Sequence, residues 1–309
     1  MERERKALKL TKYSCLVMLS ILIFQACGSV PLTGRRQLQL VSDQEVIALS
    51  LQQYQDYMRT APVERGTKNS EMVLRVGTRI SQAVETFLKN NGYESELQNF
   101  AWEFNLVKDE SVNAFAMPGG KVVIYTGLLP VTASEDALAV VVGHEIAHVI
   151  AKHSSERISQ QMLTQYGGAI AGSIIGGTAS SQLGQTVFGL GAQFGVMMPY
   201  ARKQEYEADE LGLVFMAMAG YDPNTAVPFW TRMAQSSQSS SIPEFLSTHP
   251  ADDKRIAQIE KIMPNVLTYY KGKGIANSTS QPIETKTTVP KPSSDLQIKN
   301  AKTSKEWSF

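Results

Sequence analysis

The segment His144-Glu145-Ile146-Ala147-His148 combines side chains that bind metal ions with one that can move protons. The two histidines are four positions apart, so on a helix they project from one face and can grip a single ion. Glu145 lies about 100 degrees around the helix from His144, where its carboxylate can reach a molecule held by the ion without occupying the ion. The spacing therefore predicts a two-histidine metal site with a carboxylate beside it.

Such a site suits zinc-assisted hydrolysis, because zinc bound by neutral imidazoles can lower the pKa of a coordinated water to about 7. Glu145 is then the expected general base, which takes the proton of the water and passes it to a leaving amine. A pair of structural histidines is the alternative interpretation. The rest of residues 138–150 is apolar, and burying imidazoles and a carboxylate there is costly unless a metal or hydrogen bonds satisfy them. We therefore favour catalysis.

A third protein ligand is needed, and residues 205–209 (EYEAD) offer candidates on a second predicted helix. With HExxH, this stretch resembles the pattern of the HtpX and CAAX-prenyl-protease superfamily of zinc metallopeptidases. The resemblance implies one zinc ion per subunit, with Glu205 as its third ligand. It also implies that Asp209, one turn on, orients a histidine. We interpret Glu207 as a solvated surface charge.

Residues 113–120 (NAFAMPGG) match the same superfamily. The resemblance implies an edge strand on which Ala114, Phe115 and Ala116 pair with an extended substrate by β-augmentation. Taken alone, the stretch predicts only a hairpin. Asn113 is a candidate for contacting the substrate or its oxyanion.

Residues 247–250 (STHP), followed by Arg255, resemble a downstream motif of these enzymes, in which a histidine can take the fourth position on the zinc. We hypothesise that His249 is a latch that displaces the catalytic water. A plain structural or substrate-binding histidine is the alternative. Arg255 either stabilises the oxyanion or pairs with an acid. We interpret His153, one turn past HExxH, as a cation at the helix C-terminus.

Hydrophobic periodicity predicts the helices that position these residues. Ser42 and Glu45 form a capping box for a helix that runs to about residue 58, and apolar residues at helical spacing predict a second helix over 70–89. Thr132, with Glu135 three residues later, is the expected start of the apolar helix that carries HExxH. Further helices are expected over 201–219 and within 243–260.

Between these helices the apolar period changes to two, which predicts strands at about 100–107, 112–117 and 121–126 in a small antiparallel meander. The elements together indicate an α+β fold: a mainly helical metallopeptidase domain with a small antiparallel sheet beside the HExxH helix. The glycine-rich stretch 163–198 is open to three interpretations, namely a mobile lid over the active site, core packing and membrane contact.

The N-terminus has the features of a targeting segment, because basic residues precede an apolar run that ends at Cys27. Residues 24–29 (FQACGS) resemble the lipobox of bacterial lipoproteins, so we expect cleavage before Cys27 and its acylation. An uncleaved anchor and a plain cleaved signal are the alternatives. Gly28 after the cysteine resembles lipoproteins of the outer membrane, so the expected location is periplasmic and lipid-anchored at that membrane.

These patterns divide the chain into a signal peptide (1–26), an acylated cysteine with a tether (27–41), a zinc metallopeptidase domain (42–265) and a disordered C-terminal tail (266–309). The tail is rich in Ser, Thr, Lys and Pro and has no periodic apolar face. Both cysteines lie in the N-terminal 27 residues, so we expect no internal disulfide in the mature chain.

Composition excludes one class of partner. Lys plus Arg number 30 against 29 for Asp plus Glu, so no basic excess is available for a nucleic acid. We therefore expect a membrane-tethered zinc endopeptidase that degrades misfolded or misassembled envelope proteins. This expectation follows the resemblance to the periplasmic lipoprotein branch and to the catalytic domain of β-barrel assembly-enhancing proteases. The competing hypothesis is a chaperone-like assembly factor for outer-membrane proteins with a latent protease site.

Overall fold

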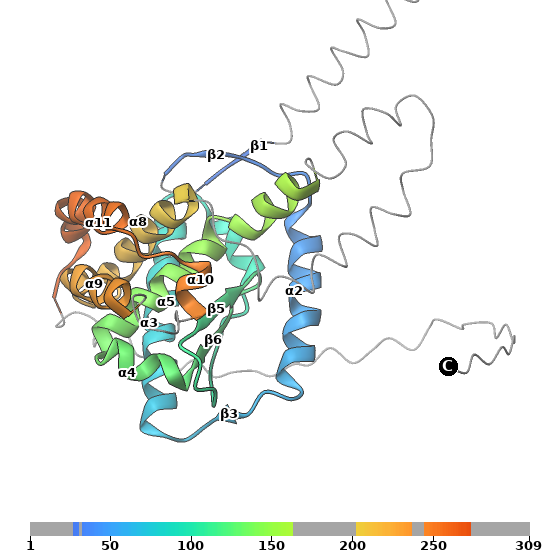
Figure 1. The fold of residues 1–309 in the computed structure, drawn as a ribbon. Coiled ribbons are helices and arrows are strands. Elements are labelled where there is room, and N and C mark those ends of the chain that lie inside the picture. The colour runs from blue at the N-terminus through green and yellow to red at the C-terminus, as the bar shows by residue number, and fades with distance from the viewer. Residues whose placement is uncertain (1–26, 31–32, 163–201, 237–243, 273–309) are drawn as a thin grey trace, which may run out of the picture. The chain divides into compact units, whose positions relative to one another are not determined.

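The HExxH motif lies on helix α5 (Glu135–Ile150), in which every residue from Ala137 onward is buried. The structure is a computed structural model, and it describes residues 27–30, 33–162, 202–236 and 244–272 (Figure 1). The expected α+β class is confirmed, because helices predominate and a small sheet lies beside α5. The stretch 163–198 and residues 273–309 of the predicted tail lie outside the described residues. The expected disorder is wrong for the first part of that tail, because Leu267–Tyr269 form the short helix η4, and Tyr269 and Tyr270 pack against the core.

Most helices begin and end close to their predicted positions. The capping box of Ser42 and Glu45 at the start of α2 is confirmed. The other helices of the described residues are α2 (Asp43–Met58), α3 (Lys68–Asn90), α4 (Leu129–Thr132), a segment over 153–162, α8 (Arg202–Met218), α9 (Ala226–Ser236), α10 (Glu244–Thr248) and α11 (Asp253–Val266). Among the described residues, none of the helices is both long and apolar enough to cross a membrane.

The predicted cap of the HExxH helix is wrong by two residues. Ser134 caps α5, and its hydroxyl accepts a hydrogen bond from the Ala137 amide at 3.1 Å. Thr132 instead closes α4, where its hydroxyl donates to the Leu129 carbonyl. The reason is Ala133, whose φ of 57° lies in the left-handed region and ends one helix before the next begins.

The sheet differs from the predicted meander in strand order. The sheet has the strand order β3-β4-β6-β5. Its strands are β3 (Val63–Glu64), β4 (Glu103–Val107), β5 (Ala114–Met117) and β6 (Lys121–Tyr125). β5 and β6 form the predicted antiparallel hairpin, but β4 pairs in parallel with β6. Alternation of apolar residues fixes which face of a strand is buried, but it does not fix the neighbour. As a result β5 lies at the edge of the sheet.

Both faces of the sheet are covered by helices. Leu106 and Ile124 belong to the main core, which they share with α3 and α5. Val107 and Val123 point to the other face and pack against Tyr54 of α2. The edge strand β5 is therefore held between α2 and α5, with its outer side next to the HExxH helix.

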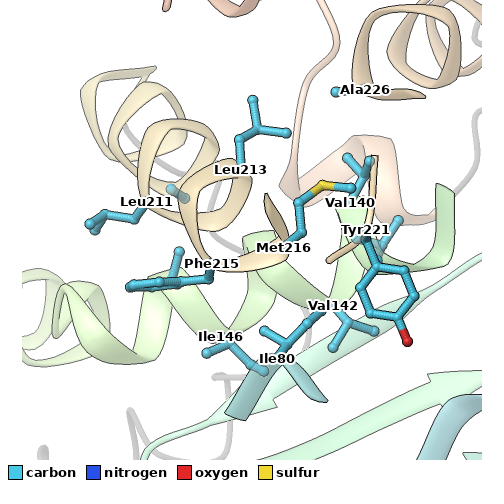
Figure 2. Close-up of a cluster of buried hydrophobic side chains, with 14 of the residues drawn as sticks. Ile80, Val140, Val142, Ile146, Leu211, Leu213, Phe215, Met216, Tyr221 and Ala226 are labelled. Carbon is cyan, nitrogen blue, oxygen red and sulfur yellow. The ribbon is translucent and has the colours of Figure 1, made fainter. Parts of the chain in front are cut away.

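Helices α5 and α8 cross with their backbones in contact, and two glycines make this possible. A Cβ atom at Gly212 would lie 2.7 Å from the His144 nitrogen, and one at Gly143 would lie 2.7 Å from the Gly212 carbonyl oxygen. Buried side chains from both helices surround the crossing, including Val140, Val142, Ile146, Leu211, Phe215 and Met216 (Figure 2). The crossing brings HExxH against the acidic stretch at the start of α8.

We predict that Gly212→Ala destabilises the protein and weakens metal binding. Gly→Ala normally stabilises a helix by about 1 kcal/mol, but overpacking here should cost about 1–3 kcal/mol or more. The measurements are thermal unfolding and metal content. Gln82→Ala, on the exposed side of α3, is the control and should change stability by less than about 0.5 kcal/mol. A Gly212→Ala protein as stable as the wild type would contradict the assigned helix contact.

Candidate metal centre

Four potential metal ligands converge from three parts of the chain. His144 and His148 project from α5, Glu205 lies in the first turn of α8, and His249 follows α10. All four are buried, and one ligand atom from each lies within 4.8 Å of the others. The structure therefore brings together the three predicted zinc ligands and the predicted fourth group.

The separations suit a tetrahedral ion. His144 Nε2 lies 3.0 Å from His148 Nε2, 3.3 Å from Glu205 Oε2 and 3.1 Å from His249 Nδ1. Ligand atoms about 2.0–2.2 Å from a tetrahedral zinc are roughly 3.3–3.6 Å apart, so the shortest of these contacts is within about 0.3 Å of that range. In addition, Glu205 Oε1 is buried without a hydrogen-bond partner among the described residues. A metal ion would satisfy this oxygen, so the donor set fits zinc.

Glu145 lies beside the ligand group. Its Oε2 accepts a hydrogen bond from the Ala116 amide at 3.2 Å. Its Oε1 lies 3.2 Å from His249 Nε2, but in the described residues this contact does not have hydrogen-bond geometry. One oxygen of the carboxylate is thus fixed by the edge strand, and the other lies where a proton could be accepted next to the metal ligands.

The His144 ring is oriented by an acid, as the resemblance implied. Asp209 Oδ1 lies 3.0 Å from His144 Nδ1. Arg255 donates two hydrogen bonds of 2.7 Å to the same carboxylate and stacks 3.6 Å from the centre of the Trp230 ring. The Arg255 side chain is 1% exposed. Of its two predicted roles, the geometry favours pairing with an acid over contact with a substrate oxyanion.

The His148 ring is held by two residues for which other roles were predicted. His148 Nδ1 lies 2.7 Å from His153 Nδ1, and His153 Nε2 lies 3.0 Å from Glu207 Oε2. The interpretations of His153 as a helix-terminal cation and of Glu207 as a surface charge are therefore wrong, because both side chains are buried. Lys152, with φ of 55°, turns the chain so that His153 folds back on α5. Nothing in the sequence around Glu207, two residues after Glu205, indicated this contact.

The charges of the site are set by competition between burial and neighbours. Burial opposes ionisation of Glu205 and Asp209, but their neighbours together outweigh it, so the pKa of both carboxyls lies below its ordinary value. The strongest of these neighbours is His249 for Glu205 and Arg255 for Asp209. Burial holds the pKa of His148 well below that of a free imidazole. For His144, burial and Arg255 are outweighed by Asp209 and Glu205, which raise its pKa to about 9. The site therefore attracts positive charge, which a metal cation can supply.

The predicted substrate strand β5 carries two amides on its outer edge. Asn113 pairs with β6 through its carbonyl, so the amides of Ala114 and Ala116 point to the other side. The Ala114 amide donates to Asn113 Oδ1 at 2.9 Å, and the Ala116 amide donates to Glu145. The Asn113 side chain thus occupies the Ala114 amide of the edge strand in this structure.

A cavity of about 80 Å³ opens along this edge. Its walls include Val46 and Leu49 of α2 and Ser154 of the helix after α5, and Phe115 and Met117 of β5 line it as well. The wall residues are mainly apolar. An extended chain that pairs with β5 would place alternate side chains against them.

Comparison with known proteins gives a consistent picture. The model of a family described as Peptidase family M48 matches residues 76–263. "Mitochondrial metalloendopeptidase OMA1" of Schizosaccharomyces pombe is 33% identical over 76% of this chain and 66% of its own length. The Saccharomyces cerevisiae protein of the same name is 29% identical over 81% and 73%. "Beta-barrel assembly-enhancing protease" of Yersinia pestis is 36% identical over 50% and 33%.

The chain spans 66% or less of most of these relatives, for example 46% of the human metalloendopeptidase OMA1. The expected periplasmic, lipid-anchored location at an outer membrane is contradicted, because fungal, plant and human relatives are named as mitochondrial proteins. A basic stretch followed by an apolar run indicates targeting but does not specify the compartment. Cys27, the predicted lipidation site, is the first residue of strand β1 (Cys27–Ser29).

We predict that Asp209→Asn weakens zinc binding about 10–100-fold, because the His144 ring loses its orienting acid. Unfolding free energy should fall by about 3–5 kcal/mol, since the buried Arg255 loses its charged partner. Zinc affinity and urea unfolding measure the two effects. Asp56→Asn is the control, because both side chains of its pair with Arg59 are exposed and the pair should contribute less than about 1 kcal/mol. Equal losses of zinc affinity and of unfolding free energy in the two variants would argue against a specific role for Asp209.

Proposed function

Because the chain belongs to peptidase family M48, we propose that it is a metalloendopeptidase that uses zinc to cut internal peptide bonds in extended segments of unfolded or misassembled proteins. The observation that carries this proposal is the buried group of two α5 histidines and one α8 carboxylate with Glu145 beside it. Thiolates are absent from this group, and imidazole with one carboxylate is a donor set that suits catalytic zinc.

In the proposed reaction His144, His148 and Glu205 hold the ion. When bound, zinc polarises the scissile carbonyl and lowers the pKa of a coordinated water. Glu145 accepts the proton of the attacking water and delivers it to the leaving amine. Burial of the site excludes bulk water, which strengthens each of these electrostatic interactions.

The edge strand supports the choice of extended substrates. The outward amides of Ala114 and Ala116 can donate to the carbonyl groups of a substrate strand once Asn113 and Glu145 release them. Backbone pairing does not depend on the substrate sequence, and the apolar cavity beside β5 favours a large apolar side chain. Unfolded proteins expose both features, whereas folded proteins bury them.

We predict that the Glu145→Gln variant keeps stoichiometric zinc but hydrolyses unfolded casein at least about 100-fold more slowly than the wild type. The reason is that glutamine preserves the shape of the side chain but cannot accept the proton. Zinc content and cleavage are measured on the same preparation. Cleavage at the wild-type rate would exclude Glu145 as the base. Full biological function without cleavage would favour the alternative, a chaperone-like assembly factor.

The contacts of His249 support a latent state of this peptidase. His249 Nδ1 lies 3.1 Å from Glu205 Oε2, and Nε2 lies 3.2 Å from Glu145 Oε1. If His144, His148 and Glu205 hold the ion, this ring is the fourth group beside it and competes with a water for the remaining position. The backbone amide of His249 bonds to the Phe245 carbonyl, which fixes the ring at the end of α10.

We predict that His249→Ala raises casein hydrolysis several-fold while zinc is retained by the three remaining ligands. The substitution removes a competitor for the water position and leaves Glu145 unchanged. Thr248→Ala, which removes a hydroxyl bonded to the Phe245 carbonyl, is the control for local disturbance. Hydrolysis that is unchanged or lower in His249→Ala would refute the latch and favour a structural or substrate-binding histidine.

A further inference from the structure

The segment expected as a tether is folded against the domain. β1 pairs antiparallel with β2 (Arg36–Leu38), and Val30 in the connection is fully buried. Arg35, in the same connection, donates two hydrogen bonds of 2.8 Å to Glu156 and one of 2.7 Å to Glu207. Thr33 donates to the other oxygen of Glu207. The Arg35 side chain is only 12% exposed, so these are protected, charge-assisted bonds.

Glu207 connects this hairpin to a metal ligand. Its carboxylate accepts from His153 Nε2, and His153 Nδ1 faces His148 Nδ1 at 2.7 Å. A carboxylate can only accept, so it fixes the proton of a neutral His153 ring on Nε2 and leaves Nδ1 as an acceptor. His148 must then donate from Nδ1, which places its lone pair on Nε2, the atom that lies among the metal ligands.

The two histidine ligands are thereby supported in parallel ways. The His144 ring is held by Asp209, which is clamped by Arg255. The His148 ring is held through His153 by Glu207, which is clamped by Arg35. In each case an acid of α8 is fixed by an arginine from a distant part of the chain. Only the second arginine comes from the N-terminal hairpin.

We propose that Arg35 and Thr33 are positioning residues of the metal centre, which fix Glu207 and, through His153, hold the His148 ring in the orientation and tautomer that bind the metal. The N-terminal hairpin is therefore part of the functional site. This inference rests on the proposed zinc function.

The test measures zinc affinity without substrate, by competition with a chromogenic chelator, and the visible spectrum of the cobalt(II)-substituted protein. Arg35→Met should weaken zinc binding about 10–100-fold and alter the cobalt spectrum, because the ligand ring is less well held. Arg79→Met is the matched control: this arginine bonds to the Ala219 carbonyl and stacks on Tyr221, and its loss should leave both readouts unchanged.

A double-mutant cycle separates positioning from general stability. If Arg35 acts through Glu207, the two substitutions should not add: the variant that combines Arg35→Met with Glu207→Gln should have the same zinc affinity as the single variant that binds zinc less tightly. Additive losses would overturn the connection through Glu207. A wild-type protein that binds no zinc would refute the proposed function itself, whereas equal zinc affinity in wild type and Arg35→Met would overturn only the positioning role.

A milder variant keeps the proposal testable if Arg35→Met does not fold. Thr33→Val is nearly isosteric and removes one hydrogen bond to Glu207 while the Arg35 pairs remain. We expect a several-fold loss of zinc affinity with little change in thermal unfolding. An unchanged zinc affinity in a folded Thr33→Val protein would overturn the role of the hairpin.

Discussion

The close crossing of α5 and α8 is the constraint on which the metal centre depends. Two of the proposed ligands come from one helix and one from the other, so the distance between the helix backbones decides whether the three can share an ion. Gly143 and Gly212 permit this distance, because a Cβ at either position would overlap the other helix. The apolar side chains around the crossing keep it dry and rigid, which holds the ligands within the few tenths of an ångström that metal binding requires.

A dry crossing also imposes a cost, because it buries charged groups. Buried carboxylates and guanidinium groups are tolerated only when each is paired and hydrogen-bonded. The structure meets this condition by pairing Asp209 with Arg255 and Glu207 with Arg35. The same pairs orient the histidine rings, so the groups that make the core electrostatically tolerable also prepare it to bind a metal. Stability and ligand geometry are therefore coupled in this protein.

The sequence predicted the parts of this arrangement that follow from local spacing. Helical periodicity located α2, α3 and α5, and HExxH together with the acidic stretch located His144, His148 and Glu205, which the fold brings together. Contacts between distant segments were not accessible in this way. The parallel pairing of β4 with β6 and the bond from Arg35 to Glu207 join residues that no periodicity relates. Glu207 was misinterpreted because an acid two positions from a ligand resembles any exposed helical charge.

The two oxygens of Glu145 link the edge strand to the metal ligands. One oxygen holds the Ala116 amide, and the other lies beside His249, which in turn contacts Glu205. A substrate strand that pairs with β5 competes for the Ala116 amide, while a water that takes the fourth position competes with the His249 ring. Binding of a substrate strand and binding of water would therefore each change the contacts of the Glu145 carboxylate. In the proposed function, substrate pairing and access of water to the metal are thus connected through Glu145, the residue proposed to accept the proton.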